Sequence, residues 1–140
     1  MKMFLVLIFS AVIFLASCQV FTIKGNKIVE EVSASYTQST SIGSVKIFIT
    51  ELQNENYFAA VDMMLKENGE SLTAAEKYGM TSDLARMKRY IGGKKLKNET
   101  VNKLTEISSV ITQEYENGNK AIFYTLEKNK LFYITNYKRE

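Results

Sequence analysis

An apolar run that ends at the only cysteine of the chain constrains this protein more than any other sequence feature. The run covers residues 4–16, follows Lys2 and leads into Ser17 and Cys18. A basic start, a short apolar stretch and small residues at its end are typical of a secretory signal peptide. A membrane-spanning helix needs about 20 apolar residues, so the shorter run favours a cleaved signal. We therefore expect residues 1–17 to be removed from the mature protein.

The end of this segment, Leu15-Ala16-Ser17-Cys18, resembles the lipobox of bacterial lipoproteins. The resemblance implies a diacylglyceryl group on Cys18 and cleavage between Ser17 and Cys18. Two or three acyl chains give stable anchoring, because each buried methylene contributes about 0.8 kcal/mol and a single chain binds only marginally. The resemblance also implies a place in the cell envelope. Gln19, where Asp would favour the inner membrane, favours the outer membrane of a two-membrane host, on its periplasmic face or at the cell surface. Plain secretion and an uncleaved membrane helix are the alternatives.

The residue types that are missing narrow the chemistry further. The chain has no His, no Trp and no Pro, and its single Cys has no partner for an intramolecular disulfide. Imidazole bases and imidazole metal ligands are therefore excluded, and lipidation would remove the one thiol. A net charge of +3 is too small to predict nucleic-acid binding. Because no phosphate-binding loop and no metal-ligand spacing is present, we expect no cofactor and no metal. The small net charge leads us to expect no nucleic-acid partner.

The segment after the leader is expected to tether a folded domain to the membrane. Residues 20–32 contain a candidate short hairpin, for which a simple tether is the alternative. Residues 33–44 are rich in Ser and Thr, which is typical of a polar linker. We therefore predict a lipidated N-terminus and tether over residues 18–42 and one domain over residues 43–140.

Two successive helices with a polar break between them are predicted at the start of this domain. Apolar residues recur there at i, i+3, i+4 and i+7, the pattern of one helix face. They are Val45, Phe48, Ile49 and Leu52. The break is Gln53-Asn54-Glu55-Asn56, and the second helix is expected to run from Tyr57 to Leu65.

Two further helices are expected before the strands. Thr73 and Glu76 have the spacing of a capping box, so a short helix is predicted to begin there and to end at Gly79. A second helix, capped at Thr81-Ser82, is predicted to end at Gly92-Gly93. Its apolar stripe consists of Leu84, Met87 and Ile91.

Three antiparallel strands are predicted in the C-terminal part, over residues 104–115, 120–126 and 131–137. Asn117-Gly118 is the strongest short hairpin signal, and residues 127–130 form a polar turn. Helices followed by such a meander indicate the α+β class. We expect the N-terminal helices to pack on a curved antiparallel sheet of three or more strands.

Alternation along these strands assigns their side chains to two faces. Tyr124 is predicted to share a face with Ile122 and Leu126, and Tyr133 with Tyr137. Both faces of these strands are partly apolar. We therefore expect the N-terminal hairpin, a partner or a ligand to cover the face that the helices leave open.

The order of a broken helix, a further helix and antiparallel strands resembles the cone-shaped fold of nuclear transport factor two and its bacterial relatives, over about residues 43–137. In that superfamily the helices and the curved sheet enclose a pocket that serves catalysis in some members and binding in others. The resemblance therefore implies a fold and leaves the function open. A cystatin-like helix-on-sheet fold is the alternative.

Four tyrosines on the predicted hairpins are candidates for a pocket wall or an interface, with cross-strand packing as the simpler interpretation. They are Tyr115, Tyr124, Tyr133 and Tyr137. The carboxylates form no catalytic pair, because Glu106 and Glu114 lie about 27 Å apart along one strand and Asp62 is expected to face solvent. We therefore expect a non-catalytic binding or scaffolding domain for a protein, a peptide or a hydrophobic small molecule. A hydrolase or isomerase that uses pocket carboxylates and tyrosines, and an exclusion or immunity lipoprotein, are the alternatives.

Overall fold

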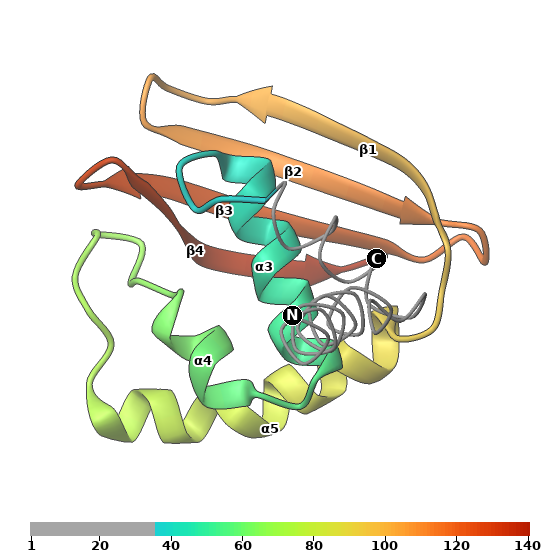
Figure 1. The fold of residues 1–140 in the computed structure, drawn as a ribbon, viewed down its shortest axis with the longest axis horizontal. Helices are drawn as coiled ribbons and strands as arrows, with labels where there is room; N and C mark the ends of the chain where they lie inside the picture. Colours follow the sequence, from blue (N-terminus) through green and yellow to red (C-terminus); the bar gives the residue numbers. More distant parts are fainter. Residues whose placement is uncertain (1–35) are drawn as a thin grey trace, which may run out of the picture. The chain divides into compact units, whose positions relative to one another are not determined.

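The computed structural model describes residues 36–140 of the chain. Its helices are α3 (Ser41–Gln53), α4 (Tyr57–Asp62) and α5 (Ala74–Ile91), and its strands are β1 (Leu96–Lys103), β2 (Ser108–Tyr115), β3 (Lys120–Lys128) and β4 (Leu131–Arg139). The strands form one antiparallel sheet in the order β1-β2-β3-β4. The sheet is curved and open, and α3 and α5 pack on the same side of it (Figure 1). The α+β class is therefore confirmed.

Several predictions concern residues outside the described part. They are the signal peptide of residues 1–17, the lipidated Cys18 and the candidate hairpin of residues 20–32. Within residues 36–140, no helix has the length and the apolar content to cross a membrane.

The first helix, α3, forms where its apolar period and its cap coincide. The Thr40 side chain accepts a hydrogen bond from the Gly43 N–H at 3.0 Å, which satisfies one of the first backbone donors of the helix. Val45, Phe48 and Leu52 are fully buried, which confirms the predicted face. The helix begins at Ser41, so the end of the predicted linker is ordered structure.

The chain is already anchored to the sheet before α3 begins. The backbone N–H of Phe132 donates to the Gln38 carbonyl at 2.7 Å, and the Gln38 amide donates to the Phe132 carbonyl at 3.0 Å.

The second helix, α4, is shorter than predicted. It ends at Asp62, and the next three residues run along the edge of β4. The Leu65 N–H donates to the Ile134 carbonyl at 3.0 Å, and the Ile134 N–H donates to the Met63 carbonyl at 2.9 Å. The predicted continuation to Leu65 is therefore wrong. The unpaired edge of β4 offers these backbone groups a partner that the sequence pattern does not reveal.

One continuous helix, α5, replaces the two helices that were predicted around Gly79. The Thr73–Glu76 capping box is present, and Leu84, Met87 and Ile91 form the buried stripe as expected. Gly79 is exposed and lies in the helix interior. A glycine there costs roughly 1 kcal/mol relative to alanine, which the burial of the stripe outweighs.

Removing the cap of α5 is expected to destabilise the domain. Thr73→Ala should lower the free energy of unfolding by about 1 kcal/mol. The backbone and side-chain hydrogen bonds from Thr73, followed by that from Lys66, lower the pKa of Glu76 to about 2. The stability that the ionised Glu76 carboxylate adds through these hydrogen bonds is present above pH 4.5 and is lost as the pH falls toward 2. Urea unfolding and NMR titration of the Glu76 carboxyl should show lower stability and a pKa closer to its ordinary value.

Thr50→Ala provides the control for this cap substitution. Thr50 is exposed, and its hydroxyl donates to the Lys46 carbonyl within α3 at 2.9 Å. We expect a change within about 0.5 kcal/mol. Equal losses in the two variants would contradict a specific role of the capping box.

The first strand, β1, was not predicted, because all of its residues except Glu99 are exposed and it has no apolar alternation. The predicted strand of residues 104–115 begins only at Ser108. Leu104 and Ile107 lie in the turn between β1 and β2 and are exposed. The predicted hairpin at Asn117-Gly118 is confirmed, and Gly118 has the φ of +86° that such a turn requires.

A β-bulge in the last pair of strands changes which side chains share a face. Tyr124 pairs with Asn136, whereas Thr125 pairs with Ile134, so β4 holds one extra residue at this point. A bulge of this kind re-aims the side chains that follow it. Tyr137 is consequently opposite the buried Phe123 and not on the face of Tyr133, so the prediction that the two tyrosines share a face is wrong.

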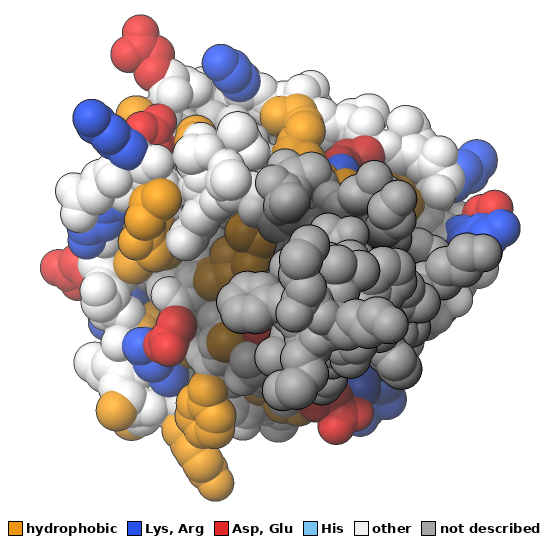
Figure 2. All heavy atoms as spheres, viewed as in Figure 1, with side chains coloured by type: hydrophobic (Ala, Val, Ile, Leu, Met, Phe, Trp, Pro, Cys, Tyr) orange, Lys and Arg blue, Asp and Glu red, His pale blue; other side chains and the backbone are white. Residues whose placement is uncertain are grey.

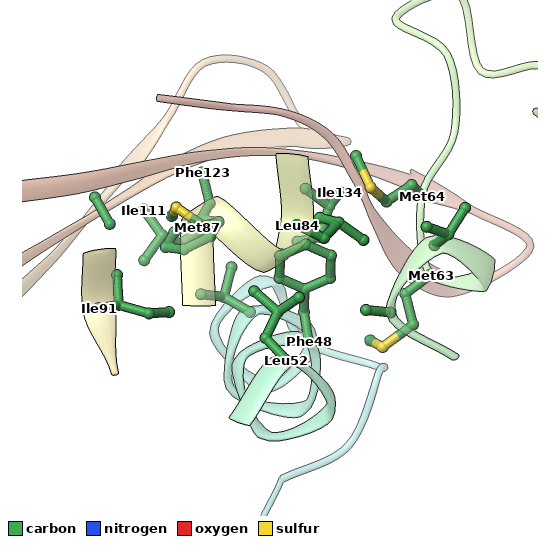
Figure 3. Close-up of a cluster of buried hydrophobic side chains, with 14 of the residues drawn as sticks. Phe48, Leu52, Met63, Met64, Leu84, Met87, Ile91, Ile111, Phe123 and Ile134 are labelled. Carbon is green, nitrogen blue, oxygen red and sulfur yellow. The ribbon is translucent and has the colours of Figure 1, made fainter. Parts of the chain in front are cut away.

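The core lies between the sheet and the helices, on what we call the inner face of the sheet. Phe48 points from α3 toward the strands, where Phe123 and Ile134 meet it, and Leu84 and Met87 of α5 lie beside it (Figure 3). All five side chains are fully buried. The inner face of β2, β3 and β4 is therefore occupied by packed side chains.

Candidate functional site

The four candidate tyrosines do not line one common site. Tyr115 is buried on the inner face, and Tyr137 is half-buried on that side. Tyr124 and Tyr133 are half-buried on the opposite side, which we call the outer face. The four tyrosines therefore do not share one face, because the side chains alternate across the sheet.

The place where the family resemblance implies a pocket is filled by aromatic rings. The Phe48 ring lies 6.1 Å from the Phe123 ring in an edge-on arrangement and 6.2 Å from the Tyr137 ring. Such pairs stabilise a core beyond the area that they bury. In addition, every buried side-chain nitrogen or oxygen of residues 36–140 has a hydrogen-bond partner. No polar group of this part is left to receive a ligand inside the core.

A chain of polar contacts continues the inner face toward β1. The Tyr115 hydroxyl donates to Gln113 Oε1 at 2.8 Å, and Gln113 Nε2 donates to Glu99 Oε2 at 3.2 Å. Glu99 Oε1 lies 3.8 Å from Lys46 Nζ, which in turn lies 4.4 Å from the centre of the Tyr36 ring. Sequence reasoning missed Glu99, because only the register of β1 against β2 brings it beside Gln113. This network satisfies its own polar groups.

The Tyr115 hydroxyl should make the domain sensitive to high pH. Burial, followed by the charges of Glu99 and Tyr90, raises the pKa of Tyr115 to about 12. The associated stability is present below pH 10 and is lost as the pH rises toward 12. Between pH 8 and 11.5, wild type should lose on the order of 1–2 kcal/mol more than Tyr115→Phe, as measured by urea unfolding.

The same substitution has a second expected effect at neutral pH. Tyr115→Phe leaves the buried Gln113 carbonyl oxygen without its donor, which should cost about 1 kcal/mol at pH 8. A wild type and a variant with parallel pH dependences would contradict the role of Tyr115 in alkaline unfolding.

A second charged cluster surrounds Asp83. The Tyr137 hydroxyl donates to Asp83 Oδ2 at 2.5 Å, and Arg86 and Arg139 lie 2.9 and 3.3 Å from Asp83 Oδ1. Burial acts to raise the pKa of Asp83, but the hydrogen bonds from Tyr137 and Arg86 and the two positive charges outweigh it and lower that pKa. Burial and Asp83 raise the pKa of Tyr137. Asp83 therefore does not supply the carboxyl of raised pKa that the hydrolase alternative requires.

The carboxylates that the sequence singled out do not converge. Asp62 is exposed and lies 2.5 Å from Lys77 Nζ, as expected for a solvent-facing residue. Glu114 pairs with Lys97 at 3.2 Å, and Glu106 is exposed in the turn after β1. The three groups therefore form no acid–base pair.

A cavity of about 320 Å³ lies beside the end of α4. Its lining consists of Asp62, Met64, Leu65, Ser71, Leu72, Lys77, Lys128, Asn129 and Tyr133. This volume is at the lower end of the range of ligand pockets. Its cationic groups are already paired, because Lys77 binds Asp62 and Lys128 donates to the Gly69 carbonyl at 2.8 Å. These pairs reduce the positive charge that the cavity offers to a ligand.

The outer face of the sheet is the second candidate surface. It carries five half-buried apolar or aromatic side chains, Val110, Ile122, Tyr124, Leu126 and Tyr133. In the described part of the chain the loop of residues 66–71 reaches it, and Asp62 of α4 and Lys77 of α5 line the cavity together with Tyr133. This loop approaches Leu126 through Gly69 and bonds Asn136 through Glu67.

The apolar side chains on the side of the molecule shown in Figure 2 lie mostly singly among charged and polar ones, outside the grey atoms. Single apolar side chains are normal on a soluble surface and do not by themselves indicate an interface. Comparisons with protein-family models and with curated proteins found no match.

Proposed function

We propose that this protein is a membrane-anchored lipoprotein of the bacterial cell envelope whose folded domain binds another protein and catalyses no reaction. The anchor is proposed from the lipobox-like ending of the leader at Cys18. The residues between Cys18 and the folded domain would give the domain distance from the bilayer.

The observation that carries the binding function is the contrast between the two faces of the sheet. In the described part of the chain the inner face is filled by Phe48 and its buried neighbours, which favours a binding surface elsewhere. The outer face leaves Tyr124 and Tyr133 partly exposed beside aliphatic side chains. Tyrosines in such a setting are enriched at protein interfaces, since they combine apolar area with a hydrogen-bonding group. A protein partner fits this face better than a small molecule does.

Site-specific photo-crosslinking in cells of the native host tests the proposal. A photoreactive phenylalanine analogue is placed at position 124 on the outer face or, as the control, at position 78. Tyr78 is 73% exposed on α5, so it is more open to solvent than the half-buried Tyr124 and lies away from the outer face. We expect a discrete adduct from position 124 that is absent from position 78.

A second substitution checks that the adduct depends on the outer face. Ile122→Lys places a charge beside position 124, because both side chains lie on that face. The adduct should disappear in this background. No adduct from position 124, or the same adducts from both positions, would contradict a partner on the outer face.

A further inference from the structure

The strand β1 is the exposed edge of the sheet. Among residues 36–140 its only neighbour is β2, and all of its side chains except that of Glu99 are exposed. An edge strand presents a row of backbone N–H and C=O groups that can pair with another strand. Val101 is 38% exposed although it is apolar, and Leu104 and Ile107 in the following turn are more exposed still.

The side chains of β1 that face the inner side follow from the register with β2. Glu99, Val101 and Lys103 lie opposite Gln113, Ile111 and Ser109, which are all buried on that side. An acidic residue and a basic residue therefore flank an apolar one at equal spacing on the same face. A strand with this pattern is complementary to a second, antiparallel copy of itself.

We propose that two copies of this chain pair through β1 in an antiparallel dimer, with the two-fold axis at Val101. In this register Val101 lies opposite Val101 of the second copy. Glu99 lies opposite Lys103, and the symmetry of the dimer repeats this ion pair. Opposite charges and apolar pairs at directly facing positions are the contacts that stabilise antiparallel strands. The two sheets then join into one continuous sheet of eight strands.

Neighbouring registers lack this complementarity. With the axis at Thr100, Glu99 would lie opposite Val101, and with the axis at Asn102, Lys103 would lie opposite Val101. With the axis at Glu99 itself, two carboxylates would face each other, which is destabilising. The charge pattern of β1 thus selects one register.

The existing contacts of Glu99 leave it able to make the new ion pair. Its Oε2 accepts from Gln113 at 3.2 Å, and its Oε1 lies 3.8 Å from Lys46 Nζ, which is long for a hydrogen bond. A carboxylate has about four acceptor sites. Lys103 is exposed and has no salt bridge in the described part of the chain. This surface is separate from the outer face and does not depend on the lipid anchor.

A charge-swap experiment with the full chain in detergent tests the pairing, with mass measured by light scattering. Wild type should be a dimer. Lys103→Glu and Glu99→Lys should each place like charges opposite each other and weaken dimerisation by at least about tenfold. A mixture of the two variants restores both ion pairs, so differently tagged copies should form a heterodimer.

The matched control for the charge swap is Lys97→Glu. It makes the same change of charge on the same strand and breaks the exposed Lys97–Glu114 ion pair within the chain, but position 97 opposes no charged residue in the proposed register. This variant should remain a dimer. Circular dichroism verifies that each variant is folded.

A cysteine experiment tests the register without altering Glu99. Val101→Cys brings two thiols opposite each other across the axis, at a Cα separation of about 4.5–5.5 Å that suits a disulfide. Lys103→Cys, which lies opposite Glu99, is the control, and the wild-type chain shows the background from Cys18. Oxidation of producing cells should give a covalent dimer of Val101→Cys well above both.

Three results would overturn the proposal. They are a monomeric wild type, failure of the two folded charge variants to associate when mixed, and equal cross-linking at positions 101 and 103. In these cases the lysines of β1 protect an edge strand from pairing, as lysines at sheet edges often do.

Discussion

Phe48→Ala is expected to lower the free energy of unfolding by about 3–5 kcal/mol. Phe48 is fully buried at the centre of the core and contacts the rings of Phe123 and Tyr137. Its removal leaves a cavity between α3 and the sheet that these neighbours cannot fill without moving. Because a domain of this size has a total stability of about 5–15 kcal/mol, the loss is a large part of the whole.

Urea unfolding followed by circular dichroism measures this effect, with Phe58→Ala as the control. The control makes the same substitution on α4, where the side chain is 59% exposed, and should change the stability by less than about 0.5 kcal/mol. The cavity variant should also gain affinity for a small apolar molecule such as benzene, since a dry apolar cavity of this kind admits one. A loss below about 1 kcal/mol at Phe48 would show that the inner face is not filled as described.

Gly43→Ala is expected to cost about 2–3 kcal/mol, although alanine normally favours a helix. A Cβ at position 43 would lie 2.0 Å from the Thr37 carbonyl oxygen and 2.7 Å from the Thr40 hydroxyl oxygen. Because the closer of these atoms belongs to the backbone, residues 37–40 would have to move. That movement would disturb both the cap of α3 and the backbone pairing of Gln38 with β4.

The comparison with Gly79→Ala separates this clash from helix propensity. Gly79 is exposed inside α5, and a Cβ there meets no heavy atom within 4 Å. Gly79→Ala should therefore raise the free energy of unfolding by roughly 0.5–1 kcal/mol. Thermal or urea unfolding of the two variants should give shifts of opposite sign. A stabilising Gly43→Ala would contradict the close approach of residues 37–40 to α3.

Features that depend on a few neighbouring residues could be predicted from the sequence. The buried face of α3, the capping box at Thr73 and the turn at Asn117-Gly118 were all predicted, because each rests on periodicity or on a local backbone requirement. The helix–strand order also followed from such local signals, and with it the α+β class.

Features that depend on distant residues could not be predicted in this way. Residues 63–65 leave α4 because the edge of β4 pairs with them. The face of Tyr137 is decided by a bulge in the pairing of β3 with β4, which the alternation along β4 alone does not reveal. The polar strand β1 carries no apolar period, so only its pairing with β2 defines it.

The candidate surface residues also divide into those that local sequence signals identify and those that only the pairing of distant residues reveals. The tyrosines were identified from their residue type, but their distribution over two faces needed the register of the sheet. Glu99 was missed, because nothing in its neighbourhood along the chain indicates that it meets Gln113 and Lys46. The proposed pairing of Glu99 with Lys103 of a second copy rests on the position of β1 at the edge of the sheet.

Metabolic labelling with radioactive palmitate, followed by mass determination of the mature N-terminus, tests the proposed membrane anchor most directly. The account predicts a labelled wild-type protein that begins at Cys18, and a Cys18→Ser variant without label. Equal labelling of the two proteins, or a mature N-terminus at any other residue, would contradict the assignment of this chain as a lipoprotein.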